Sequence, residues 1–225
     1  FNEKIKEKIN DFRTSGFNIT IPFKKNIIKH LDNQDPHSRK IGAVNCVTIK
    51  KKIKGTNTDW IGFLNSINYK KINKKNRIII LGYGGAGQAI HYGLYKKGFR
   101  NIVIFNRSRK IVKSINKKMY TKKFSLINEF LPSAGLIINT TPTNPINKRQ
   151  SNLVKKTTLV SDIVYRPKNT PFLKSFEKNK KIYGIHMLVE QAIPCFYQWF
   201  GFSPKADNAL YNKLNKKIKW QKLLV

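Results

Sequence analysis

The feature that most constrains the fold of this chain is a cluster of glycines between an apolar segment and a segment with helical periodicity. Residues 77–81 read Arg-Ile-Ile-Ile-Leu, and the next six read Gly-Tyr-Gly-Gly-Ala-Gly. Such a loop turns tightly out of a buried strand, lets the backbone approach a phosphate, and lets the following helix pack closely on the strand. The positive end of that helix faces the anion. The sequence therefore predicts a strand over 77–81, a helix over 84–97 and a dinucleotide at their junction.

The glycine loop and the end of the next predicted strand indicate which dinucleotide binds. The loop residues that we expect to contact the cofactor are Gly82, Gly84, Gly85, Ala86 and Gly87. A dinucleotide without a 2′-phosphate usually meets an Asp or Glu about 20 residues further on, whereas this chain has Asn106, Arg107 and Ser108 there. The Arg107 guanidinium can pair with a 2′-phosphate and stack on the adenine, and Arg109 or Lys110 could add a second contact. The sequence therefore predicts NADP.

Strands and helices alternate after the glycine loop. We predict strands over 101–105, 136–139, 159–165 and 182–184, with helices over 111–120 and 171–179. Alternation of this kind builds a parallel sheet with right-handed crossovers. The chain is therefore predicted to be an α/β protein with a Rossmann-like parallel sheet.

The rest of the chain shows shorter patterns. We predict helices over 2–14, 24–31 and 60–68, strands over 17–21 and 42–50 with a third ending near 58, and a helical, aromatic-rich tail over 187–225. The longest apolar runs, such as Ile78 to Leu81, are far too short to cross a bilayer. We therefore expect no membrane-spanning segment.

The composition is strongly basic, with 45 Lys and Arg against 11 Asp and Glu and a net charge of +34. Such a charge makes nucleic acid a candidate partner, but the positive residues are spread along the whole chain. We therefore expect no specific nucleic acid partner, and a positive field that attracts small anions. The two cysteines, Cys46 and Cys195, fit no metal-ligand spacing and indicate a reduced, cytoplasmic compartment. No metal site is predicted.

Three segments before the glycine loop combine small or amide side chains with a single charged group. They are 16–24, 42–45 and 55–62. This mixture suits a polyhydroxylated ligand, which needs many donors and acceptors at fixed points.

In their order along the chain, these motifs resemble those of the shikimate dehydrogenase family. The resemblance rests on Asn-x-Thr-x-Pro-x-Lys ending at Lys24, Gly-Ala-Val-Asn at 42–45, Asn-Thr-Asp at 57–59 and the glycine loop. It continues through 106–108, 139–142, 162–165, 170–173, Gly184, 187–189, Gln191-Ala192, Phe196 and Trp199-x-Gly201. It therefore covers nearly the whole chain.

The resemblance implies an oxidoreductase that reduces 3-dehydroshikimate to shikimate with NADPH, a step of chorismate and aromatic amino acid biosynthesis. It also implies a smaller α/β substrate domain over 1–59, a Rossmann-like nucleotide domain over 60–184, and C-terminal helices over 185–225 that return to the substrate domain. The active site would lie in a cleft that closes between the domains. We expect a cytoplasmic monomer or homodimer whose partner is a small-molecule substrate.

The resemblance also implies roles for individual residues. Lys24 and Asp59 match the catalytic pair, in which an ammonium donates a proton and a carboxylate holds the lysine and a ring hydroxyl. The residues that match positions hydrogen-bonded to ring hydroxyls are Asn18, Thr20, Asn45 and Gln191. Tyr165 matches a position near the substrate carboxylate, and Ile163 and Gly184 match positions near the nicotinamide.

The chain departs from the family at its beginning. Family members start with a strand, a Ser-x-Ser loop, a helix and another strand, and this sequence shows none of these. We expect the smaller domain to lack its first βαβ unit, the substrate carboxylate to lack its serine hydroxyls, and the missing residues to lie upstream. The alternatives are an inactive pseudoenzyme, a relative that uses quinate or NAD, and a basic nucleic-acid-binding module.

Overall fold

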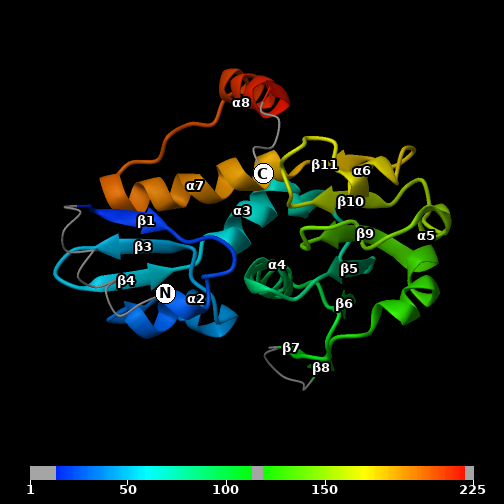
Figure 1. Ribbon diagram of the computed structural model, residues 1–225, viewed down its shortest axis with the longest axis horizontal. Coiled ribbons are helices and arrows are strands. Elements are labelled where there is room, and N and C mark those ends of the chain that lie inside the picture. Colours follow the sequence, from blue (N-terminus) through cyan, green and yellow to red (C-terminus); the bar gives the residue numbers. More distant parts are fainter. Residues whose placement is uncertain (1–13, 113–118, 221–225) are drawn as a thin grey trace.

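Two sheets lie at opposite ends of the molecule, with helix α3 (Asp59–Ser66) between them (Figure 1). The structure, a computed structural model, describes residues 14–112 and 119–220. Helix α3 packs against α4 (Gly85–Lys96), which covers the larger sheet, and against the long helix α7 (Gly184–Phe200). It therefore joins elements from the middle and the end of the chain. Among the residues that the structure describes, no helix combines the length and the apolar character needed to cross a membrane.

The larger sheet is parallel throughout, as predicted. Its strands, in spatial order, are β11 (Lys181–Ile182), β10 (Leu159–Asp162), β9 (Ala134–Asn139), β5 (Arg77–Leu81) and β6 (Ile102–Phe105). The central strand β5 has the predicted bounds, and its residues from Ile78 to Leu81 are fully buried. A parallel strand covered on both faces carries this kind of continuous apolar run.

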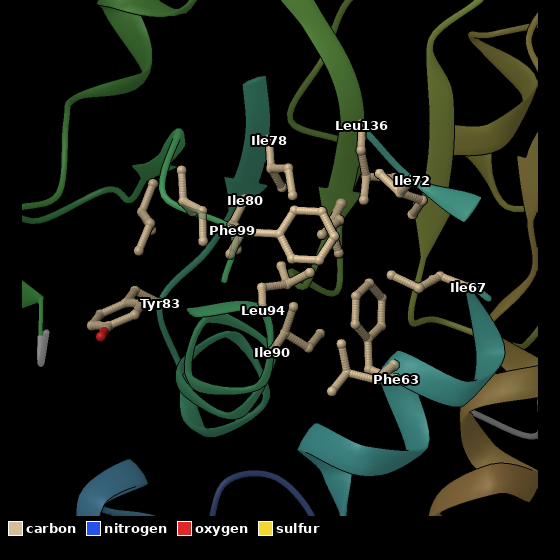
Figure 2. Close-up of a cluster of buried hydrophobic side chains, with 14 of the residues drawn as sticks. Phe63, Ile67, Ile72, Ile78, Ile80, Tyr83, Ile90, Leu94, Phe99 and Leu136 are labelled. Atoms are coloured by element: carbon tan, nitrogen blue, oxygen red, sulfur yellow. The ribbon is translucent and has the colours of Figure 1, made fainter. Parts of the chain in front are cut away.

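The side chains of β5 alternate between two hydrophobic cores. Ile78 and Ile80 point into a core with Phe63 of α3 and Leu94 of α4, which Figure 2 shows. Ile79 and Leu81 belong to the core on the other face, where Phe172 of the short helix α6 (Pro171–Lys174) packs. Helix α5 (Lys148–Asn152), which the sequence analysis did not predict, begins at a capping box formed by Asn147 and Gln150. The period of two along β5 thus places helices on both faces of the sheet.

The smaller sheet is mixed. Its strands, in spatial order, are β1 (Gly16–Asn18), β3 (Cys46–Ile49), β4 (Ile53–Thr56) and β2 (Asn33–Gln34). Strands β1, β3 and β4 pair antiparallel, and β2 pairs parallel with β4. Ile19, Ile27, Val44 and Val47 form its core.

Helix α2 (Pro36–Ile41) is a further element that the sequence analysis did not predict. The carboxylate of Asp35 accepts hydrogen bonds from the amides of His37 and Ser38, and Gly42 ends the helix with a φ of 73°. A side-chain cap, proline at the first position and a left-handed glycine are standard helix boundaries. These signals therefore explain a helix too short to show a clear apolar period.

One predicted helix is wrong. Residues 111–112 and 119–120, inside the helix expected over 111–120, form the antiparallel strands β7 (Ile111–Val112) and β8 (Met119–Tyr120). Just after β8, the Lys122 amide donates to the carbonyl of Ile104, and the Asn106 amide donates to the carbonyl of Lys122. These bonds extend the edge of the larger sheet beside β6, and edge pairing overrides a weak helical pattern.

The bounds of other elements differ less from the predicted ones. The helix expected over 24–31 is a 3-10 helix over Asn26–His30, and the strand expected over 42–50 is shorter and begins at Cys46. The helix expected over 171–179 ends at Lys174. In the tail, α7 and α8 (Asn208–Trp220) are separated by a non-helical segment. The helix expected over 2–14 lies outside the described residues except for Thr14, which is not helical.

Candidate active site

A cleft of about 560 Å³, the central cleft, is lined by residues of the smaller sheet and its loops, by the loops after β9 and β10, and by α3, α4 and α7. All the predicted substrate-binding residues line it, namely Asn18, Thr20, Lys24, Asn45, Asp59, Tyr165 and Gln191. Three of the predicted cofactor-binding residues also line it, namely Ala86, Ile163 and Gly184. The structure thus brings together side chains that are far apart in the sequence.

Lys24 and Asp59 form an ion pair in the central cleft. The Lys24 Nζ atom lies 2.5 Å from the Asp59 Oδ2 atom, and the two side chains are only 13% and 5% exposed. Asp59 begins helix α3, where the positive end of the helix stabilises a carboxylate. A pair with this little exposure is weakly screened, so removal of either partner would leave an uncompensated charge.

An amide network fixes the carboxylate of Asp59 from its other side. The Asn45 Nδ2 atom lies 3.0 Å from Asp59 Oδ1, 2.9 Å from Thr58 Oγ1 and 2.9 Å from Gln191 Oε1. The Asn57 side chain accepts a hydrogen bond from the Asp59 amide and donates to the carbonyl of Ala43. An amide nitrogen carries two hydrogens. Because three acceptors surround Asn45 Nδ2, at most two of them can accept a hydrogen bond from it at one time.

Two buried cysteines, Cys46 and Cys195, lie next to this network. The Cys195 Sγ atom lies 3.2 Å from Asn18 Nδ2 and 3.2 Å from Thr58 Oγ1. A hydrogen bond from the Cys46 thiol lowers the pKa of Cys195, against burial, which raises it. The same bond and burial raise the pKa of Cys46. Neither residue was predicted as a site residue, because an isolated Cys in a strand or a helix carries no signal of this contact.

The glycine loop fits a tight turn against β9. Gly82 has a φ of 95°, and a Cβ atom there would lie 2.7 Å from Thr140 Oγ1. A Cβ atom on Gly87 would lie 2.5 Å from the carbonyl oxygen of Gly82. A side chain at either position would therefore collide with the turn.

The same loop leaves room for a ligand at the N-terminus of α4. A Cβ atom on Gly84 would have no neighbour within 4 Å, and one on Gly85 would lie 3.3 Å from Lys24 Cβ. The first amides of a helix have no intrahelical partner and attract anions. This open, amide-lined end of α4 lies beside Lys24, so it fits the pyrophosphate of a dinucleotide.

The loop after β6 is organised by Asn106. Its Oδ1 atom accepts a hydrogen bond from the Tyr83 amide, and its Nδ2 atom donates to the carbonyl of Ser108. Arg107 and Ser108 are exposed and do not line the central cleft. The neighbouring Arg109 guanidinium lies 4.2 Å from the ring centroid of Tyr120. An exposed guanidinium joined through Asn106 to the glycine loop fits a phosphate at the far end of a dinucleotide.

The buried carboxylate of Asp162 holds the loop after β10. Its Oδ1 atom accepts from the Val164 amide at 3.0 Å and from Asn139 Nδ2 at 3.2 Å, and its Oδ2 atom accepts from Thr170 Oγ1 at 2.6 Å. Burial raises the pKa of Asp162, and these hydrogen bonds lower it. The carboxylate thus joins both ends of the segment that carries Tyr165, a role that the sequence analysis did not assign.

Several residues that line the central cleft were not predicted as site residues. They are Ile19, Ile21, Thr140, Thr141, Pro142, Val164, Arg166, Met187 and Leu188. Arg166 follows Tyr165 directly, so its position in the sequence was a signal that could have been used. Within the described residues, no group of three or more His, Cys, Asp or Glu is placed to hold a metal ion.

Comparisons with known proteins agree with this geometry. Residues 2–47 match the family described as "Shikimate dehydrogenase substrate binding domain", and residues 66–177 match "Shikimate / quinate 5-dehydrogenase". A shikimate dehydrogenase (NADP(+)) of Methanococcus maripaludis is 36% identical over 226 residues, which cover 91% of this chain and 78% of that protein. One of Bartonella quintana is 34% identical over 232 residues, with 92% and 79% covered.

A solved structure shares the fold. The crystal structure of shikimate 5-dehydrogenase from Thermus thermophilus, in complex with NADP(H) and shikimate, matches with a TM-score of 0.76 and 27% sequence identity. The match covers 95% of this chain and 82% of that chain.

Proposed function

The chain belongs to the shikimate dehydrogenase family, and from this premise we propose that it reduces the ring ketone of 3-dehydroshikimate to the alcohol of shikimate with NADPH. The observation that carries the proposal is the Lys24–Asp59 ion pair in the central cleft, beside the open N-terminus of α4. A proton donor and a cofactor-binding helix end thus share one cleft.

The side chains of the cleft are suited to protonating a ketone oxygen. NADPH, when bound, supplies the hydride that is added to the ketone carbon. The Lys24 ammonium donates a hydrogen bond to the ketone oxygen, stabilises the negative charge that develops there, and transfers a proton to it. Asp59 holds the ammonium in place and accepts a hydrogen bond from a neighbouring ring hydroxyl. Lys24 regains its proton from solvent, so the reaction consumes one hydride and one proton.

The remaining polar groups of the cleft orient the substrate ring. We assign Asn18, Thr20, Asn45 and Gln191, which line the cleft, to the ring hydroxyls. Tyr165, which also lines it, is assigned to the substrate carboxylate. Asn45 and Gln191 are already hydrogen-bonded to each other and to the Asp59 network. A site whose groups are held before binding loses little entropy when the substrate enters.

The cofactor residues divide among three parts of the dinucleotide. We assign Gly82, Gly84, Gly85, Ala86 and Gly87 to the pyrophosphate, and Asn106, Arg107 and Ser108 to the adenosine with its 2′-phosphate. Ile163 and Gly184 line the central cleft and are assigned to the nicotinamide. Residues 1–59 with 185–225 would act as the substrate domain of a cytoplasmic monomer or homodimer, and residues 60–184 as the nucleotide domain.

A substrate and cofactor comparison tests the proposal. The full-length protein is assayed in the oxidative direction with shikimate or quinate and with NADP⁺ or NAD⁺, by the absorbance of the reduced cofactor. We expect the largest kcat/KM with shikimate and NADP⁺. Larger values with quinate or NAD⁺ would reassign the substrate or the cofactor, and no turnover by a protein that binds NADP⁺ would identify an inactive relative.

A further inference from the structure

The central cleft contains a positive charge that the proposed reaction does not use. Among the described residues that line it, only Lys24, Asp59 and Arg166 are charged. Asp59 is paired with Lys24 at 2.5 Å, so these two charges offset each other. Arg166 therefore leaves the cleft with a net positive charge, which favours an anionic group on the ligand.

The Asp162 side chain holds the loop that carries Arg166 at the cleft. Asp162 accepts hydrogen bonds from the Val164 amide and from the Thr170 hydroxyl, and Arg166 lies between these two attachment points. Its guanidinium lies 6.0 Å from the ring centroid of Tyr165, and both residues line the cleft. The loop thus presents an aromatic hydroxyl and a guanidinium from adjacent positions.

We propose that Arg166 binds the carboxylate of the substrate and makes the enzyme select an anionic ring over a neutral one. This inference rests on the proposed function, in which the substrate carries one carboxylate on its ring. A guanidinium presents paired N–H donors that match the two oxygens of a carboxylate. Tyr165 adds a hydroxyl beside it. Arg166 contributes to substrate affinity and not to proton transfer, since Lys24 and Asp59 are the residues assigned to the ketone.

The structure offers a matched control in the same loop. Lys168 also lies between the two attachment points on Asp162, but it does not line the central cleft, and its Nζ atom lies 5.0 Å from the ring centroid of Tyr183. Replacement of Arg166 or of Lys168 by Gln removes one positive charge from the loop in each case. Only the first change removes a charge from the cleft.

The experiment measures the affinity of wild type, Arg166→Gln, Arg166→Lys and Lys168→Gln for shikimate and for its neutral methyl ester. Titration calorimetry without cofactor gives Kd in the absence of turnover. We expect Arg166→Gln to weaken shikimate binding about 10- to 100-fold, since a hydrogen bond to a charged group has this effect. Binding of the ester should change less than about threefold, Arg166→Lys should lie between, and Lys168→Gln should match wild type.

Three results would overturn the proposal. The first is an equal loss of affinity for shikimate and for its ester in Arg166→Gln. The second is an unchanged Kd for shikimate in that variant, and the third is wild-type protein that binds neither ligand. A rise in KM for NADP⁺ in Arg166→Gln, with shikimate binding unchanged, would assign Arg166 to a cofactor phosphate instead. Wild-type protein that binds shikimate through Arg166 but does not oxidise it would support this inference and overturn the proposed function.

Discussion

At the scale of single residues, the site is built from pairs whose members depend on each other. Lys24 and Asp59 are 35 positions apart, yet their charged atoms are 2.5 Å apart. Asn45 holds Asp59 through one oxygen while Lys24 holds it through the other. A substitution in this set therefore changes the position of its partners as well as its own chemistry.

Loss of the proton donor should reduce turnover more than cofactor binding. We expect Lys24→Met and Asp59→Asn to lower kcat by about 10²- to 10⁴-fold, the usual contribution of a positioned proton donor. The KM for NADP⁺ should stay within about threefold of wild type, because both side chains are assigned to the substrate. Steady-state kinetics measures both values. Lys29→Met is the control, because Lys29 is exposed in the 3-10 helix that follows Lys24, and an equal loss there would contradict the assignment.

Two glycines of the loop should respond differently to alanine. Gly84 has a φ of −79° and open space at its Cβ position, so Gly84→Ala should fold normally but place a methyl group at the proposed pyrophosphate site. We expect KM for NADP⁺ to rise about tenfold or more with an unchanged melting temperature. Gly82→Ala should instead destabilise the fold by about 1–3 kcal/mol, because its φ is 95° and Thr140 is too close.

Thermal unfolding and NADP⁺ titration separate the two effects. A stable Gly84→Ala variant with wild-type affinity for NADP⁺ would show that the cofactor does not approach the backbone at this point.

At the scale of elements, the accuracy of the sequence predictions followed the strength of the local signal. Strand β5 was predicted with its observed bounds because a continuous apolar run ends at a glycine turn. The helix predicted over 111–120 was wrong, because β7 pairs with β8 and Lys122, just after β8, pairs with the end of β6. The pairing beside β6 depends on residues outside the segment, so the segment's own periodicity could not indicate it.

Helix α4 contains a group that should make the fold sensitive to acid. Burial lowers the pKa of His91 from 6.5 to about 4, and its Nδ1 atom has no hydrogen-bond partner among the described residues. Because the folded pKa is the lower one, the unfolded chain binds the proton first. The contribution of neutral His91 to the free energy of unfolding is thus fully present above pH 6.5 and is lost as the pH falls towards 4. At about 1.4 kcal/mol per pH unit, the loss is about 3 kcal/mol.

Chemical denaturation at several pH values measures this contribution. We expect the free energy of unfolding of wild type to fall by about 3 kcal/mol more than that of His91→Phe between about pH 7 and pH 4. Parallel curves for the two proteins would show that His91 is hydrated in the folded state.

At the scale of the whole molecule, the net charge of +34 acts on every anion that approaches. The proposed substrate and cofactor are both anionic, so the field should raise their rates of association. Salt screens this field, since the Debye length falls from about 30 Å at 0.01 M to about 3 Å at 1 M. We expect kcat/KM for shikimate and for NADP⁺ to fall severalfold over this range, with a much smaller change in kcat.

Steady-state kinetics across a series of KCl concentrations checks this prediction. An uncharged osmolyte at matched osmolality serves as the control. A kcat/KM independent of salt would show that the positive residues lie too far from the cleft to steer its ligands.

The sequence by itself determined the glycine turn, the buried strand before it and the residue types of the site, because these depend on backbone freedom and on local apolar periodicity. It also contained the ordered motifs that indicated the family. Only the tertiary structure decided which of these residues meet. Asn45 reaches Gln191 across 146 positions because α3 packs on α7, and Arg166 faces the cleft because Asp162 holds its loop. Such contacts arise from the packing of the two sheets around α3 and α7, which no local pattern specifies.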